Sequence, residues 1–103
     1  MDVIHFCSGL PKRAEFQVIG KQLLRSATSV GANYRSAQRA RSRVDFIAKL
    51  AIVEEEADAS VYWMQLLSDL SCGPRLELER LLDEARQLVA IFVASRKTAK
   101  RGQ

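Results

Sequence analysis

Apolar residues recur every three or four positions along most of the chain, which is the spacing of one face of an α-helix. The longest such series runs from Phe16 to Ala37 and predicts a helix over residues 12–40. Similar spacing predicts three further helices, over residues 2–8, 43–71 and 75–97. We therefore expect an all-α, four-helix bundle of residues 1–97 with a short first helix, and a basic, disordered tail over residues 98–103 that lacks apolar anchors.

The boundaries between these segments carry helix start and stop signals. Gly9 and Pro11 end the first segment, and Gly73 with Pro74 separates the last two. Ser42 and Asp45 have the S-x-x-D spacing of an N-terminal capping box, in which the serine hydroxyl accepts from the backbone N–H three residues on. We therefore expect the third helix to begin at this serine.

The third segment carries apolar residues on two opposite sides of the predicted helix. One side is a regular core stripe with the members Phe46, Leu50, Val53, Ala57, Val61 and Met64. The other is a second stripe, with the members Ile52, Ala59, Trp63, Leu66 and Leu70. A soluble monomer rarely exposes a large contiguous apolar patch, so we expect the second stripe to be a homo-oligomer interface. Coverage of Trp63 and Leu66 by the first helix or by the tail is the alternative.

The second segment is basic on the side opposite its apolar face. Four cations keep the helical rhythm there and two more follow near the next helix, so the candidate nucleic-acid-binding residues are Lys21, Arg25, Arg35, Arg39, Arg41 and Arg43. Repeated cations suit phosphate backbones of any sequence. Small residues on the flank between the two faces, Gly20, Ala27 and Gly31, predict a close approach of a neighbouring helix.

Composition and charge indicate the class of protein but do not indicate one function. The chain has 103 residues, 48% of them hydrophobic, and a formal net charge of +4, which fits one globular domain. The charge is laid out in blocks, since residues 12–49 and 85–103 are mainly basic while residues 50–84 are mainly acidic. This layout favours either a basic surface for an acidic partner or salt bridges between the blocks.

A string of ordinary residues in the second and third segments resembles a known family. It comprises Gln22-Leu23-Leu24-Arg25-Ser26-Ala27, Ser29-Val30, Asn33, Ser42, Asp45-Phe46 and Leu50. This string resembles the bacterial four-helix-bundle proteins whose genes lie in ribosomal-RNA intervening sequences and diversity-generating retroelements. The resemblance implies an antiparallel up-and-down bundle, rings of five subunits, and, in one accessory member, binding to nucleic acid and a reverse transcriptase. It also implies a longer first helix, so we expect either a true start upstream of Met1 or an incomplete bundle.

Catalytic and cofactor chemistry finds no support in the residue pattern. The one histidine, His5, belongs to no metal-binding motif, and Cys7 and Cys72 form no CxxC pair. Glu54 and Asp58 share a helix face and are expected to be solvated or salt-bridged. We expect no cofactor, no enzymatic activity, no membrane span and a cytoplasmic location. The prediction is therefore a homo-oligomeric structural or scaffold protein; the alternative is a nucleic-acid-binding accessory protein.

Overall fold

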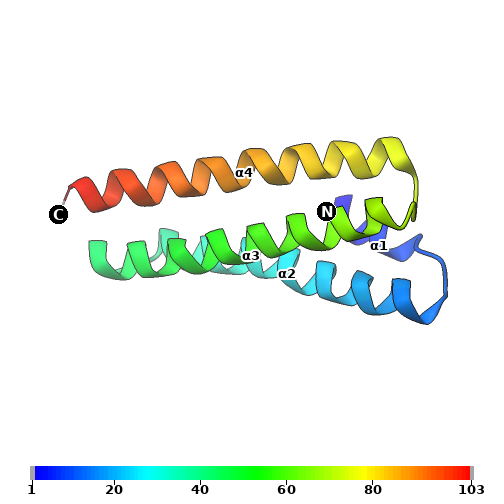
Figure 1. The fold of residues 1–103 in the computed structure, drawn as a ribbon. Helices are drawn as coiled ribbons and strands as arrows, with labels where there is room; N and C mark the ends of the chain where they lie inside the picture. Colours follow the sequence, from blue (N-terminus) through cyan, green and yellow to red (C-terminus); the bar gives the residue numbers. More distant parts are fainter. Residues whose placement is uncertain (1, 103) are drawn as a thin grey trace.

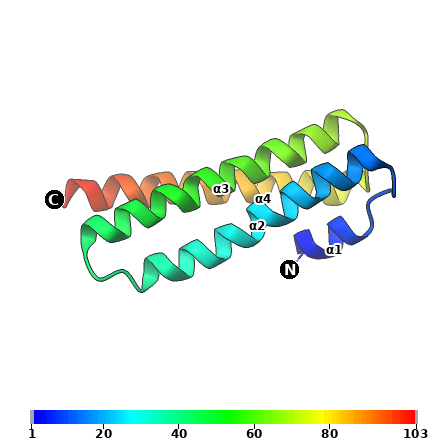
Figure 2. The ribbon, with the colours of Figure 1, turned by 90° about the horizontal axis from the view of Figure 1, so that it is seen from below.

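Three long antiparallel helices and one short helix form the molecule. The computed structural model describes residues 2–102, and the elements are α1 (Asp2–Ser8), α2 (Ala14–Gln38), α3 (Arg43–Asp69) and α4 (Arg75–Arg101). The long helices run up, down and up along a body 48 Å long and 19 Å across, with α3 packed against both α2 and α4 (Figures 1 and 2). The short α1 packs against α2 and α4 near the turn between α3 and α4. The fold is the all-α four-helix bundle with a short first helix that the sequence predicts.

The start of α3 follows the predicted capping signal. The hydroxyl oxygen of Ser42 accepts a hydrogen bond from the backbone N–H of Asp45 at 3.1 Å. The Asp45 carboxylate pairs with Lys49 at 3.2 Å. A serine cap of this kind contributes about 1 kcal/mol to helix stability. The cap therefore fixes where the turn after α2 ends.

The turn between α3 and α4 depends on a glycine. Gly73 has φ of 84°, a left-handed conformation that side chains rarely adopt, and a Cβ built there would lie 3.0 Å from the Phe6 ring. Pro74 follows at the N-cap position of α4. The turn therefore brings the start of α4 close to α1.

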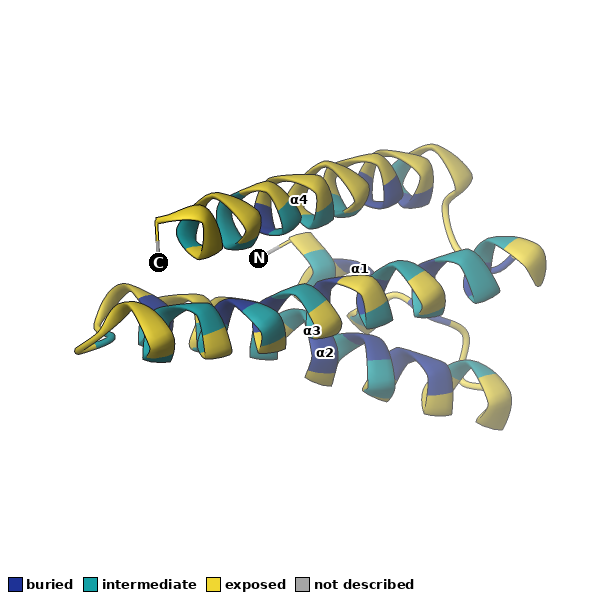
Figure 3. Cartoon of the chain, turned by 60° about the vertical axis from the view of Figure 1, so that its left-hand side comes forward, coloured by how far each residue is buried: buried dark blue, intermediate teal, exposed yellow. Residues whose placement is uncertain are grey.

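The buried core is uneven along the bundle. The larger of two clusters lies at the end that α1 covers and contains Phe6, Leu10, Ile19, Leu23, Met64, Leu67, Cys72, Leu78, Leu81 and Leu82. The smaller cluster contains only Val53, Ala57 and Phe92. Figure 3 shows the same asymmetry on α4, whose buried positions gather towards its start. We refer to the end with the larger cluster as the α1 end.

Two glycines on the same flank of α2 have different surroundings. A Cβ at Gly20 would lie 2.8 Å from the Leu10 side chain, so the predicted close approach is confirmed there. A Cβ at Gly31 would meet nothing within 4 Å, so the prediction is wrong there. The reason is the length of α1, which covers Gly20 but not the flank around Gly31. A groove of about 240 Å³ remains between α2 and α4, with Ala27, Val30, Gly31 and Leu88 among its lining residues.

The end of the chain differs from the prediction. Helix α4 continues to Arg101, so residues 98–101 are helical rather than a disordered tail. Lysine, arginine and alanine all favour helices, and cations at a helix C-terminus offset its partial negative charge. The Arg43 guanidinium also donates a hydrogen bond to the carbonyl oxygen of Gly102, which ties α4 to the start of α3. Residue 103 lies outside the described residues.

Candidate nucleic-acid interface

The structure gathers cations from distant parts of the sequence at one end of the bundle. The turn between α2 and α3 and the C-terminus of α4 lie together at the end opposite the α1 end (Figures 1 and 2). Seven exposed cations lie in these segments: Arg35, Arg39, Arg41, Arg43, Lys97, Lys100 and Arg101. We call this set the basic end.

Carboxylates do not neutralise the basic end. Residues 35–43 and 96–102 contain no aspartate or glutamate. Two nearby carboxylates have other partners, since Glu54 pairs with Arg96 at 2.6 Å and Asp45 pairs with Lys49. Within residues 2–102, no member of the basic end has a carboxylate within 4.0 Å. Its positive charge therefore faces solvent without a paired anion from the described part of the chain.

Helix dipoles offset only a small part of this charge. The C-termini of α2 and α4 and the N-terminus of α3 meet at this end. Each helix terminus is equivalent to about half an elementary charge, negative at a C-terminus and positive at an N-terminus. The three termini together contribute about −0.5 of an elementary charge, whereas the side chains contribute seven positive charges. A strong positive potential remains.

The predicted basic ridge is divided by the fold. Arg35, Arg39, Arg41 and Arg43 come together at the basic end. Arg25 lies further along α2, where its guanidinium pairs with Glu56 of α3 at 3.2 Å. Lys21 is exposed nearer the α1 end, beside α1. Salt bridges between the basic and acidic blocks therefore form at Arg25 and at Arg96, whereas the cations of the basic end form none with residues 2–102.

Three members of the basic end were missed by the sequence prediction. Lys97, Lys100 and Arg101 fall in or beside the segment expected to be a disordered tail. The signal that points to them is the excess of cations after residue 85, where no acidic residue occurs. Helical spacing alone could not place this segment at the same end of the bundle as Arg39, because the two are more than fifty residues apart.

The predicted oligomer interface is partly covered in the single chain. Ile52 and Leu70 are exposed, with 44% and 47% of their surface accessible. Trp63 and Leu66 are half-buried and pack against the larger core cluster, and Ala59 is also half-buried. Tyr62, which the prediction omitted, is 59% exposed and packs edge-on against Trp63 at 4.9 Å between ring centroids. Three apolar side chains therefore remain exposed along α3: Ile52, Tyr62 and, at its C-cap, Leu70.

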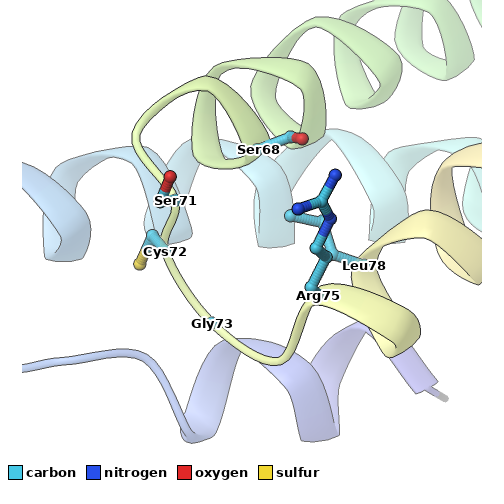
Figure 4. A pocket seen from close by; sticks show the side chains of 6 residues that line it. All are labelled: Ser68, Ser71, Cys72, Gly73, Arg75 and Leu78. Carbon is cyan, nitrogen blue, oxygen red and sulfur yellow. The ribbon is translucent and has the colours of Figure 1, made fainter.

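One hollow and two cysteine thiols lie away from the basic end. A pocket of about 250 Å³ lies at the turn between α3 and α4, with Ser68, Ser71, Cys72, Gly73, Arg75 and Leu78 as its lining. Figure 4 shows the side chains of Cys72 and Arg75 pointing in different directions. Both cysteines are free thiols, and burial raises the pKa of Cys7 and of Cys72. Such thiols are less reactive at neutral pH than exposed ones.

Residues 2–102 hold no group of three or more histidine, cysteine, aspartate or glutamate side chains placed to bind a metal ion. None of the helices within this range combines the length and the apolar character that crossing a bilayer requires. The basic end and the exposed apolar side chains of Ile52, Tyr62 and Leu70 are surface features that bear on function.

Comparison with known proteins decides the family. A family model described as 23S rRNA-intervening sequence protein matches residues 1–94. The chain belongs to this family. A crystal structure of a protein of unknown function from the S23 ribosomal protein family of Bacteroides thetaiotaomicron is similar, with a TM-score of 0.74 and 39% sequence identity over 78% of this chain and 74% of that chain. No curated protein matches. Membership in the 23S rRNA-intervening sequence protein family thus accounts for the fold and leaves the activity to be argued from the surface.

Proposed function

We propose that the protein is a non-enzymatic nucleic-acid-binding protein that holds the phosphate backbone through its basic end. The observation that carries the proposal is the convergence of seven cations, from α2, the turn after it, α3 and α4, on one end of a narrow bundle, where none has a carboxylate partner among residues 2–102. The resemblance to a family with one nucleic-acid-binding accessory member agrees with a polyanionic partner.

Phosphate contacts favour this arrangement for an electrostatic reason. Each phosphate that a lysine or arginine neutralises releases condensed counterions from the nucleic acid. A protein that makes about six to ten such contacts loses roughly 10³- to 10⁵-fold in affinity between about 50 and 200 mM salt. Seven cations at the basic end are enough to place the protein in this range.

The test compares two triple variants that remove the same charge from opposite ends. The basic-end variant carries Arg39→Gln, Arg41→Gln and Lys97→Gln, which remove three cations of the basic end. The α1-end variant carries Lys12→Gln, Lys21→Gln and Arg75→Gln, which remove three cations towards the α1 end. Fluorescence anisotropy with labelled RNA and DNA at low salt should show at least a roughly tenfold weaker affinity for the first variant, because it loses phosphate contacts. Equal loss in both variants would show that only net charge matters, and an unaffected first variant would contradict the proposal.

Self-association is a second candidate function, favoured by the exposed apolar side chains of Ile52 and Tyr62 on α3 and of Leu70 at its C-cap. A homo-oligomeric scaffold would cover these side chains, and the family resemblance suggests a ring of five. Sedimentation velocity should show a species heavier than the 11.6 kDa chain. Ile52→Asp with Leu70→Asp should return it to the monomer without unfolding, because both side chains are exposed. Trp63 is a poorer choice for this test because it packs on the core. A monomeric wild-type protein would remove this candidate.

A further inference from the structure

We infer that the ligand of the basic end is a nucleic-acid duplex, which the protein holds by its phosphate backbone without reading its bases. The inference rests on the proposed function and names the form of nucleic acid that this surface fits. Three observations carry it: the residue types at the basic end, the way the end is built, and the surface beside it.

The segments of the basic end carry no aromatic platform for unpaired bases. Residues 35–43 and 96–102 contain no phenylalanine, tyrosine or tryptophan. Tyr34, beside Arg35, is 40% exposed, and one side of its ring packs against Phe92 with 5.6 Å between centroids. Proteins that bind single strands without sequence preference rely on successive bases stacked on aromatic side chains, at about 1–3 kcal/mol per base. One half-covered tyrosine supplies at most a small part of this contribution to a single strand.

The cations come from three helices and the turn between two of them. Arg35 lies on α2, Arg39 and Arg41 in the turn after it, and Arg43 in the first turn of α3. Lys97, Lys100 and Arg101 lie on α4, and α2 and α4 each pack against α3 in a body 19 Å across. A duplex presents phosphates in fixed positions on both sides of grooves about 6 to 12 Å wide. It also carries a charge about every 1.7 Å along its axis. Cations carried by separate helices suit two phosphate rows better than one flexible strand.

The surface beside the basic end confines the contact to the tip. A hollow of about 310 Å³ between α3 and α4 is lined by Arg96 and Lys100, but also by Glu54 and Glu55. Glu54 already pairs with Arg96, and Glu55 is exposed. Two carboxylates repel a phosphate, and the hollow therefore does not suit an extruded nucleotide. The contact we infer is a backbone contact at the tip of the bundle.

Anisotropy titrations with four labelled probes test this inference. The probes are an RNA duplex of about 16 base pairs, long enough to span successive grooves, its isolated strand, the DNA duplex of the same sequence, and an RNA duplex of scrambled sequence. We expect both original duplexes to bind at least about fivefold more tightly than the strand, because duplexes release more counterions per contact. The scrambled duplex should bind within about twofold of the original, because phosphate contacts carry no sequence information.

The outcomes separate this inference from the proposed function. A strand that binds as tightly as the duplex overturns the duplex assignment. A scrambled duplex that binds clearly more weakly overturns the claim that the bases are not read. Nucleic-acid binding itself stands in both cases. If only the RNA duplex or only the DNA duplex binds more tightly than the strand, the ligand is limited to that type of duplex. The claim that the phosphate backbone common to both is recognised is then overturned. If no probe binds at low salt, the proposed function fails as well. The α1-end triple variant should reproduce the wild-type ranking of all four probes.

Discussion

The two ends of the bundle differ in both packing and charge. At the α1 end four helices meet around ten buried residues, and several arginines are ion-paired, as Arg80 is with Asp2 and Glu84 at 3.0 Å. Beyond the reach of α1 only three helices meet, and the second buried cluster has three members, Val53, Ala57 and Phe92. At the basic end none of the seven cations has a carboxylate partner among residues 2–102. The comparison indicates that one end supplies most of the folding free energy while the other presents a surface for a partner.

The division has a physical reason. Unpaired like charges gathered in a small area repel each other, and this repulsion destabilises the compact state. A well-packed core elsewhere in the same cooperative unit can offset it, because hydrophobic burial contributes about 25 cal/mol per Å². A short α1 that concentrates the core at one end therefore permits the other end to carry charge.

The largest expected effect comes from matched leucines at the two ends. Leu67 and Leu50 are both 0% exposed, but Leu67 belongs to the larger cluster while Leu50 belongs to neither. Leucine-to-alanine changes in cores cost about 2–5 kcal/mol, and the cost is larger where the surroundings cannot collapse. We expect Leu67→Ala to fall near the upper limit and Leu50→Ala near the lower one in urea unfolding. A larger loss for Leu50→Ala would reverse the assignment of stability to the α1 end.

A smaller effect is expected from the cap at the start of α3. Ser42→Ala removes the acceptor for the Asp45 N–H and should lower the free energy of unfolding by about 1 kcal/mol. Amide hydrogen exchange should accelerate in the first turn of α3 and leave the α1 end unchanged. Ser42→Asp, which keeps an acceptor, is the control. Uniform acceleration in both ends would show that the cap holds the whole bundle rather than the basic end.

The smallest effect, and one of opposite sign, is expected at the glycines of α2. Gly31→Ala should raise the free energy of unfolding by up to about 1 kcal/mol, because alanine favours a helix and the added methyl enters open space. Gly20→Ala should give no gain, since its methyl would press on the buried Leu10 side chain. Thermal unfolding followed by circular dichroism distinguishes the two. Equal gains at both positions would mean that α1 does not hold its place on α2.

Sequence reasoning succeeded where the signal is local. The spacing of Leu23, Leu50 and Leu78 and the cap at Ser42 predict helices and a start site, because a helix places residues three and four apart on one face. It was less successful where two segments meet. The open space at Gly31 depends on the length of α1, and the position of Lys97 at the same end as Arg39 depends on how α2 and α4 are aligned along α3. Helical periodicity predicts neither. Four of the six predicted basic residues therefore came together, while Lys97, Lys100 and Arg101 were missed.

The salt dependence of duplex binding tests the central claim most directly. For the wild-type protein and both triple variants, the logarithm of the association constant is measured against the logarithm of salt concentration. Each lost phosphate contact reduces the magnitude of the slope by about 0.9 on duplex DNA. We predict that the basic-end variant loses roughly 2 to 3 units of slope while the α1-end variant keeps the wild-type slope within about 0.5. Identical slopes for the wild-type protein and the basic-end variant would contradict the account.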